Sequence, residues 1–199
     1  MTASEIDAIE WGWAGSALED ESGDLHVVVA FPGGAMVALI DGLGHGREAA
    51  EAARAAARVI EAHAADPVAP VIERCHDALR GTRGAAMTIA SLCTADSLSW
   101  AGVGNVDAVV LRRDGRPAAG IAVRGGVVGY QLPPLRAATV GIAPGDLLIL
   151  ATDGVHAGFT DGIVPGGAPQ DIADAILTRW ARGSDDARVV VARYLGGPS

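Results

Sequence analysis

The stretch of sequence that decides the fold is Ala38-Leu39-Ile40-Asp41-Gly42-Leu43-Gly44-His45-Gly46-Arg47. It begins as an apolar strand, ends in the carboxylate of Asp41, turns on three glycines and runs into an alanine-rich segment that predicts a helix. A carboxylate at the end of a strand is an oxygen ligand held on a rigid element, and hard cations such as Mg²⁺ and Mn²⁺ take oxygen ligands. The stretch therefore indicates a candidate cation site.

The same pattern, a strand that meets a carboxylate, recurs far away in the chain. Asp153-Gly154 follows the apolar run 147–151, and Asp185-Asp186 precedes the apolar run 189–191. One Asp-Gly dipeptide is common turn chemistry and indicates little by itself. A purely structural glycine turn after Asp41 would not explain why the pattern is repeated, so the set of carboxylates indicates one shared site.

A fourth carboxylate, Asp24, stands directly before the strand predicted over residues 25–31. Pro32-Gly33-Gly34 predicts a hairpin turn into a second strand over residues 36–40. In an antiparallel hairpin the start of one strand lies beside the end of its partner. Asp24 and Asp41 are therefore expected at the same end of the hairpin.

Composition limits the classes of function. A chain of 199 residues with 50% hydrophobic residues predicts one globular domain over residues 1–199. Only 4% of the residues are aromatic and the net charge is −9, which argues against a nucleic-acid partner. Cys75 and Cys93 fall in helical and strand patterns and are expected to be buried thiols. The polar start of the chain and the lack of a membrane-length apolar run predict a cytoplasmic protein without membrane association.

Strands outnumber helices in the predicted secondary structure. Strands are predicted over residues 6–13, 25–31, 36–40, 86–93, 97–102, 107–112, 121–123, 126–131, 137–140, 147–151 and 188–194. Helices are predicted over residues 48–65, 68–79 and 170–182. Many of the strands are joined by hairpins, which favours antiparallel sheets covered by helices over a doubly wound parallel sheet.

Two other kinds of site fit the residues less well. The G-x-G pattern after the strand invites a dinucleotide-binding interpretation, but the helix that follows leads into another helix and not into a parallel strand. A structural Ca²⁺ loop would need a dense set of ligands, and the segment Asp20–Asp24 lacks the required spacing.

The motifs as a set resemble the protein phosphatase 2C superfamily, and more narrowly its small bacterial SpoIIE-like branch, of which the stressosome phosphatase RsbX is a member. They are Ser22-Gly23-Asp24, Ile40-Asp41-Gly42-Leu43-Gly44-His45-Gly46, Gly102-Val103-Gly104-Asn105-Val106, Thr152-Asp153-Gly154 and Asp185-Asp186, together with Arg83-Gly84-Ala85-Ala86-Met87-Thr88. The resemblance covers nearly the whole chain.

The resemblance implies an α+β fold, a four-layer α/β/β/α sandwich of two antiparallel sheets flanked by helix pairs. It implies two Mn²⁺ or Mg²⁺ ions that activate a bridging water, with Asp41 between them, the Gly42 carbonyl on one of them, Asp24 in the same cluster, and Asp153 and Asp185 on the other side. The sequence leaves open whether Asp185 or its neighbour Asp186 is the ligand.

The activity that the resemblance implies is that of a monomeric phosphoprotein serine/threonine phosphatase. The implied substrate is a phosphorylated STAS-domain protein of the stressosome or anti-sigma-antagonist type. The alternative is a degenerate module that binds such a partner without hydrolysing it. The complete set of carboxylates favours the enzyme.

Three features depart from the family pattern or stay open. Arg188 stands where a threonine is usual, and it is expected to alter the hydrogen bonding at that strand end. His45 is either an acid for a leaving alkoxide or a solvent-exposed or helix-capping residue. The loop 157–167 contains Phe159 and Ile163, which either contact the partner or pin the loop to the core.

Overall fold

The computed structural model describes residues 4–6, 8–116, 119–120 and 122–197. Its elements in chain order are β1 (Ser4–Ile6), β2 (Ile9–Ser16), β3 (Asp24–Phe31), β4 (Gly34–Gly42), α1 (Arg47–Ala62), α2 (Val68–Ala78), β5 (Ala85–Cys93), β6 (Ser97–Val103), β7 (Asp107–Leu111), β8 (Ala119–Gly120), β9 (Ala138–Gly141), β10 (Leu147–Ala151), α3 (Pro169–Trp180) and β11 (Ala187–Tyr194).

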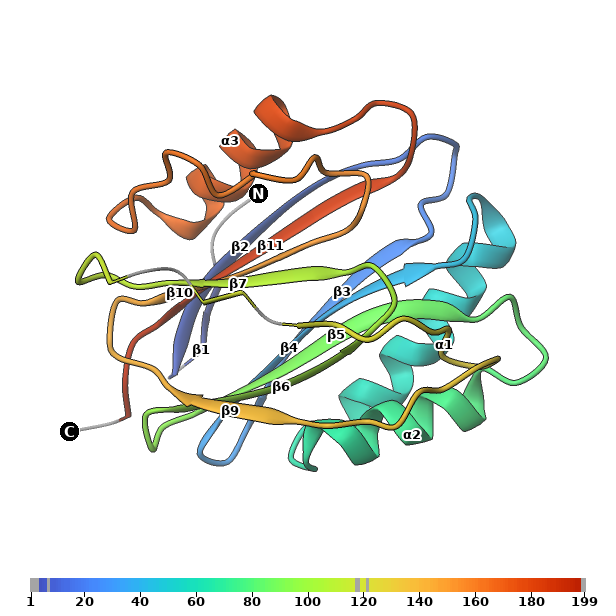
Figure 1. The fold of residues 1–199 in the computed structure, drawn as a ribbon, viewed down its shortest axis with the longest axis horizontal. Helices are drawn as coiled ribbons and strands as arrows, with labels where there is room; N and C mark the ends of the chain where they lie inside the picture. Colours follow the sequence, from blue (N-terminus) through green and yellow to red (C-terminus); the bar gives the residue numbers. More distant parts are fainter. Residues whose placement is uncertain (1–3, 7, 117–118, 121, 198–199) are drawn as a thin grey trace.

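The described strands form two antiparallel sheets that pack face to face, with helices on both outer faces (Figure 1). One sheet has the order β3-β4-β5-β6-β9, and the other has the order β1-β2-β11-β10-β7-β8. Helices α1 and α2 cover the five-stranded sheet, and α3 covers the six-stranded sheet (Figure 1). The predicted four-layer α/β/β/α sandwich is confirmed.

Helix α1 lies close to the five-stranded sheet because its buried face is made almost entirely of alanine. The buried residues of the helix are Ala49, Ala50, Ala52, Ala53, Ala56, Ala57 and Ile60. Alanine has the best helix propensity and a short side chain, so this face both favours the helix and permits close packing. The contact is closest at the end of β4, where a Cβ on Gly42 would lie 2.2 Å from the carbonyl oxygen of Ala49. Only glycine fits there.

The core between the sheets is made of alternate residues of both sheets, as expected for strands with one face inward. Its fully buried residues include Val37, Leu39, Leu98, Leu150 and Tyr194. A second apolar layer lies under α1 and α2, and a third lies under α3. Within the described ranges every helix is too short or too polar to cross a lipid bilayer.

The six-stranded sheet carries one helix and a loop where a second helix pair was predicted. Residues 155–168 run over this sheet without forming a described helix and then enter α3 at Pro169. Gln170 at the start of α3 ties the helix to β2, since its Nε2 donates to the Trp13 carbonyl at 2.8 Å. The loop and α3 share one apolar layer, so the loop replaces the missing helix in covering the sheet.

Three strand predictions are corrected by the structure. The strand predicted over residues 6–13 is two strands, β1 and β2, which pair from Ile6 with Ile9, while residue 7 lies outside the described residues. The strands predicted over residues 121–123 and 126–131 are absent from the described residues, which form only isolated bridges there, and residue 121 lies outside them. Gly126 and Gly129 both adopt positive φ angles, which bend the chain out of an extended ladder.

Candidate functional site

Two of the predicted site carboxylates meet through the β3–β4 hairpin. Asp24 is the first residue of β3 and pairs directly with Asp41 near the end of β4. Asp24 is buried, with 3% of its surface exposed, and Asp41 is half-buried. Gly42 is buried beside them, and its amide donates to the carbonyl oxygen of Gly23 at 3.1 Å. The hairpin thus places this pair at one end of the sandwich, as predicted.

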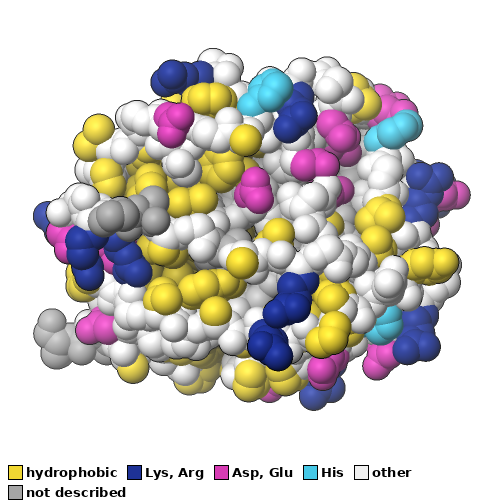
Figure 2. All heavy atoms as spheres, in the orientation of Figure 1, with side chains coloured by type: hydrophobic (Ala, Val, Ile, Leu, Met, Phe, Trp, Pro, Cys, Tyr) yellow, Lys and Arg dark blue, Asp and Glu magenta, His cyan; other side chains and the backbone are white. Residues whose placement is uncertain are grey.

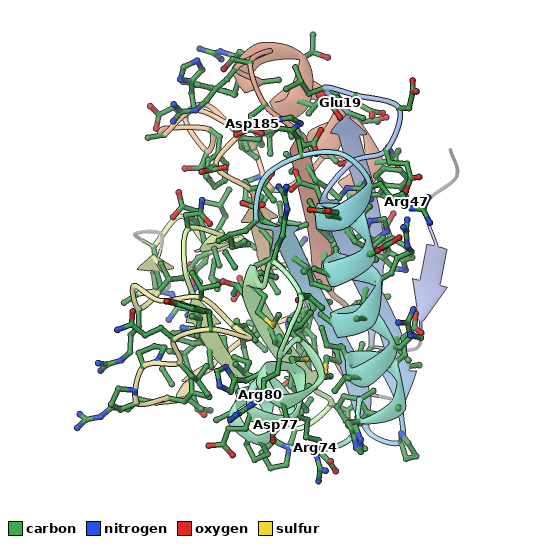
Figure 3. The ribbon with its side chains drawn as sticks, turned by 90° about the vertical axis from the view of Figure 1, so that its right-hand side faces the viewer. Glu19, Arg47, Arg74, Asp77, Arg80 and Asp185 are labelled. Atoms are coloured by element: carbon green, nitrogen blue, oxygen red, sulfur yellow. The ribbon has the colours of Figure 1, made fainter. Side chains whose placement is uncertain are left out.

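The other two carboxylates reach the same end from the six-stranded sheet. Asp153 follows β10 and Asp185 precedes β11, and these strands are antiparallel neighbours. Figure 3 shows Asp185 at the end of the molecule opposite Asp77. The backbone at Gly154 packs tightly against the residues just before β11, since a Cβ on Gly154 would lie 1.9 Å from the carbonyl oxygen of Asp186. Glycine at position 154 is therefore required for the two acidic turns to approach one another.

A depression of about 350 Å³ opens between the two sheets at this end. Asp41, Asp153 and Asp185 all line it, whereas Asp24 lies beneath it and Gly42 is not among its lining residues. The full lining is Leu18, Asp41, Leu43, Gly44, His45, Asn105, Asp153, Ser184 and Asp185. Acidic side chains gather at the upper right of Figure 2, toward the end of the sandwich at which β11 begins in Figure 1. The structure therefore brings together carboxylates from distant parts of the chain.

The two hairpin carboxylates have raised pKa values. Burial, together with the negative charges of Asp24, Asp153 and Asp185, raises the pKa of Asp41 to about 8, against a hydrogen bond from Asn105. Burial likewise raises the pKa of Asp24 to about 7, opposed by a hydrogen bond from Thr152. Because these carboxylates repel one another and are short of compensating donors, the site favours protons or cations.

Asp185 and Asp186 have different surroundings, although they are adjacent. The buried carboxylate of Asp186 accepts the amides of Leu18 at 2.7 Å and Gly23 at 2.6 Å. It therefore ties the segment before β3 to the start of β11. Asp185 is exposed on the depression and accepts only the amide of Asp186, at 2.9 Å, among the hydrogen bonds of the described residues. Asp185 is the one of the two that is free to bind a ligand.

Asn105 and Thr152 contact the carboxylates, a role that was not predicted from the sequence. Asn105 stands in a glycine-rich turn, where asparagine is a common turn former, and its Nδ2 donates to Asp153. The buried hydroxyl of Thr152 donates to Asp24 at 2.7 Å. The only sequence signal was position, since Asn105 lies in a glycine-rich turn and Thr152 precedes Asp153.

The histidines have different surroundings. His45 lines the depression and pairs with Glu19, Nδ1 to Oε1 at 2.7 Å. It is exposed at the rim, and α1 has Gly46 as its N-cap and no side-chain cap hydrogen bond, so the structure gives His45 no capping role and its role as an acid stays a prediction. His156 is exposed, its amide donates to the Trp180 carbonyl at 2.8 Å, and it does not line the depression.

Arg188, the departure from the family pattern, lies between the two sheets. Its Nη1 is 3.1 Å from Nδ1 of His26, and its guanidinium stacks on Trp13 at 4.8 Å. Burial and this cation lower the pKa of His26 to about 4, so that the imidazole is neutral near pH 7 and Nδ1 accepts. The Arg188 amide donates to the Thr152 hydroxyl at 2.9 Å, so the strand ends stay hydrogen-bonded. The positive charge of Arg188 also favours the ionised form of Asp24.

The donor set fits a hard divalent cation, although the side chains that line the depression do not form a ready-made metal cluster. Among the described residues no three His, Cys, Asp or Glu side chains stand close enough to form a metal cluster. The donors are all oxygens, which Mg²⁺ and Mn²⁺ prefer. Burial and mutual repulsion raise the pKa values of Asp24 and Asp41, so a cation at this place would stabilise their ionised forms. The residues present therefore fit such a cation chemically.

Comparison with known proteins agrees with this geometry. Two packed antiparallel sheets with helices on both outer faces are the fold of the protein phosphatase 2C type. The family model for stage II sporulation protein E (SpoIIE) matches residues 32–195, and the chain belongs to this family. No curated protein matches the sequence.

Three solved structures illustrate the similarity. The structure of RsbX in complex with magnesium has a TM-score of 0.87 at 22% identity and covers 97% of this chain and 98% of its own. A chain from work on the bacterial stressosome, "a modular system that has been adapted to control secondary messenger signaling", has a TM-score of 0.84 at 29% identity, covering 93% and 99%. The catalytic domain of the serine threonine protein phosphatase PstP, in complex with 2 manganese ions, has a TM-score of 0.74 at 16% identity, covering 94% and 99%.

Proposed function

We propose that this chain is a metal-dependent phosphoprotein serine/threonine phosphatase. The observation that carries the proposal is the convergence of Asp41, Asp153 and Asp185 on one depression, with Asp24 buried beneath them. These residues come from both sheets, and a protein has no need to place mutually repelling carboxylates together for stability alone. The membership of the SpoIIE family supports the same activity.

In this proposal the carboxylates hold two Mn²⁺ or Mg²⁺ ions. Asp41 would bridge them, the Gly42 carbonyl and Asp24 would complete one side, and Asp153 and Asp185 would hold the other. Two such cations, when bound, lower the pKa of a shared water and neutralise the charge of phosphoryl oxygens. Similar structures solved with magnesium or with two manganese ions support this assignment.

The other polar residues would position the carboxylates. Asn105 donates to Asp153 and limits the orientations of that side chain. Thr152 donates to Asp24 and, through its backbone and hydroxyl, links that carboxylate to β11. Preorganised ligands of this kind reduce the cost of ordering the site when it is loaded.

We further propose that the substrate is a phosphorylated STAS-domain protein of the stressosome or anti-sigma-antagonist type. Support comes from the similarity to RsbX and to a chain solved in work on the stressosome. The proposal concerns a protein substrate because the depression is open to solvent at the end of the sandwich and is not an enclosed small-molecule cavity.

Phosphate release from a serine-phosphorylated STAS-domain protein tests the activity, with Mn²⁺ and with excess chelator. We expect release only with Mn²⁺, and a loss of at least about 100-fold in Asp41→Asn and Asp153→Asn. Asp77→Asn is the matched control, because Asp77 is an exposed carboxylate at the opposite end of the molecule (Figure 3). Full turnover in chelator would refute the proposal. Tight binding without phosphate release would favour the degenerate module instead.

Thermal unfolding provides a second test that does not need a substrate. A cation that binds only the folded chain stabilises it by mass action, by about 2.7 kcal/mol at 100 times its dissociation constant. We expect Mn²⁺ to raise the melting temperature of the wild type and of Asp77→Asn, and to have much less effect on Asp41→Asn. A melting temperature that millimolar Mn²⁺ leaves unchanged would contradict a metal site at these residues.

A further inference from the structure

Two exposed leucines stand on the rim of the acidic depression. Among the described residues five large hydrophobic side chains are exposed, and two of these five, Leu18 at 47% and Leu43 at 37%, line this one depression. Single exposed leucines are ordinary on protein surfaces. Two that flank the same set of carboxylates, in an otherwise polar depression, form a local apolar rim next to the proposed reaction site.

The backbone holds both leucines in place. The Leu18 amide donates to the buried carboxylate of Asp186 at 2.7 Å, and the Leu43 amide donates to the carbonyl oxygen of Gly84 at 3.0 Å. Leu43 also stands between two glycines, which offer no side chains to cover it. Because both backbones are anchored, the side chains are presented to solvent on a rigid support.

Two ion pairs lie beside the leucines. His45, which lines the depression, pairs with Glu19 at 2.7 Å, and Arg83, which lies next to Gly44, pairs with Glu48 through Nε at 2.6 Å. A macromolecule that approaches the depression would therefore find paired charges and two uncovered leucines. Apolar flanking residues match this rim.

We propose, resting on the phosphatase function above, that Leu18 and Leu43 bind apolar side chains next to the phosphorylated residue of the substrate protein. The two leucines would then select among phosphoproteins while the carboxylates perform the reaction. Burial of two half-exposed leucine side chains is expected to be worth about tenfold in kcat/KM. A contact of this kind helps only a substrate that reaches the rim.

A pair of phosphoserine peptides tests the proposal. One carries leucine on both sides of the phosphoserine, the other carries serine there, and an aryl phosphate serves as a substrate without flanks. With Mn²⁺, we expect the wild type to prefer the leucine peptide about tenfold in kcat/KM, and Leu18→Ser/Leu43→Ser to lose most of this preference. Leu195→Ser is the matched control, since Leu195 is 40% exposed and follows β11 at the end opposite Asp185. It should keep the preference.

The outcomes separate this proposal from the function on which it rests. Equal turnover of both peptides by the wild type, or a preference that survives in the double variant, would overturn the apolar rim and leave the phosphatase intact. If the wild type hydrolyses neither peptide nor the aryl phosphate, the phosphatase function fails. In that case fluorescence anisotropy with the same peptides tests the apolar rim by binding alone. The rim predicts that the wild type binds the leucine peptide more tightly than the serine peptide, and that the double variant loses this difference. Circular dichroism of each variant shows whether it is folded.

Discussion

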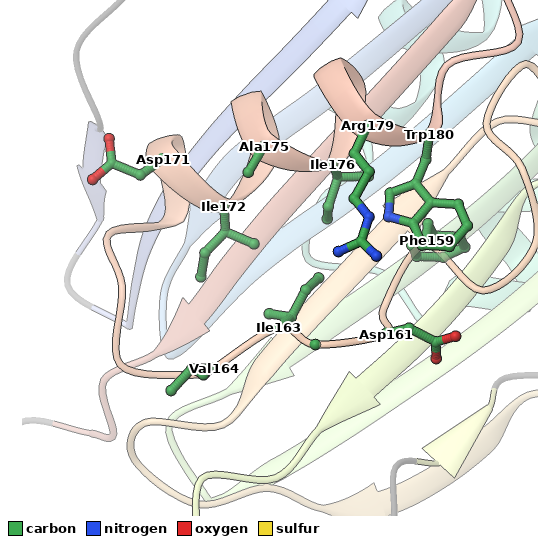
Figure 4. Close-up of a pocket in the computed structure, with 11 residues that line it drawn as sticks. Phe159, Asp161, Ile163, Val164, Asp171, Ile172, Ala175, Ile176, Arg179 and Trp180 are labelled. Carbon is green, nitrogen blue, oxygen red and sulfur yellow. The ribbon is translucent and has the colours of Figure 1, made fainter.

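Phe159→Ala is expected to destabilise the fold, because Phe159 is part of the core. The sequence left two roles open for this residue, partner contact or pinning of the loop 157–167. In the structure Phe159 is 5% exposed and belongs to the apolar layer between the six-stranded sheet and α3. Figure 4 shows it beside Trp180, facing inward along the groove between the loop and the helix. The loop is pinned to the core by this side chain.

The size of the effect follows from the packing around Phe159. Truncation of a buried phenylalanine to alanine costs about 3–5 kcal/mol, with more when the cavity cannot relax. Phe159 lines an open groove of about 330 Å³, so solvent and neighbouring side chains can fill part of the space. The lower end of the range, about 3 kcal/mol, is therefore expected. For a chain of about 200 residues this corresponds to a decrease of about 6–12 °C in melting temperature.

Urea denaturation and calorimetry of the wild type and Phe159→Ala provide the measurement. Val164→Ala is the control from the same loop, because Val164 is 74% exposed, and it should change the unfolding free energy by less than about 0.5 kcal/mol. A decrease of less than about 1 kcal/mol in Phe159→Ala would refute the core role. If turnover of the phosphoprotein then fell while the melting temperature held, the loop would belong to substrate recognition after all.

Three further predictions concern buried polar groups. In chelator, the raised pKa values of Asp41 and Asp24, about 8 and about 7, mean that the folded chain binds more protons than the unfolded chain above about pH 4. The unfolding free energy should therefore be highest below pH 4 and fall as the pH rises to about 8, and urea melts of Asp41→Asn should show a smaller fall and greater stability at pH 8. Thr152→Val removes the donor to Asp24 and should cost about 1–3 kcal/mol in chelator, whereas Thr152→Ser should restore the wild-type urea midpoint. Asp146→Ala leaves the nearly buried Arg112 without its 2.8 Å partner and should cost about 3 kcal/mol in thermal unfolding, with Mn²⁺ binding by calorimetry unchanged.

Local sequence was enough to predict the hairpin half of the site. Pro32-Gly33 forms the tight turn, and the register from Phe31 with Gly34 carries through to Asp24 with Asp41. Only a few residues separate the paired strands, so turn chemistry and alternation determine the pairing. The fold class followed in the same way from hairpin-connected strands and alanine-rich helices. The strand predicted over residues 126–131 failed because the positive φ angles of Gly126 and Gly129 override a short apolar pattern.

The different roles of the neighbouring residues in the site could be assigned only from the tertiary structure. Asp185 and Asp186 are the same residue type at adjacent positions, and no pattern separates them. The fold turns Asp186 onto the amides of Leu18 and Gly23 and leaves Asp185 on the depression. The amides that Asp186 accepts lie more than 160 residues away along the chain. Asn105 reaches Asp153 across a separation of 48 residues in the same way.

The sequence by itself determined that four carboxylates stand at strand ends and that two of them share a hairpin, because these features depend on residues close together in the chain. Only the tertiary structure decided that Asp153 and Asp185 lie at the same end of the sandwich as Asp24 and Asp41. It also decided that Phe159 faces the core, and that Leu18 and Leu43 are exposed beside the carboxylates. Those outcomes depend on how the two sheets and the segments between their strands pack against one another. Packing is set by the fit of whole apolar faces to one another, and no single stretch of sequence contains it.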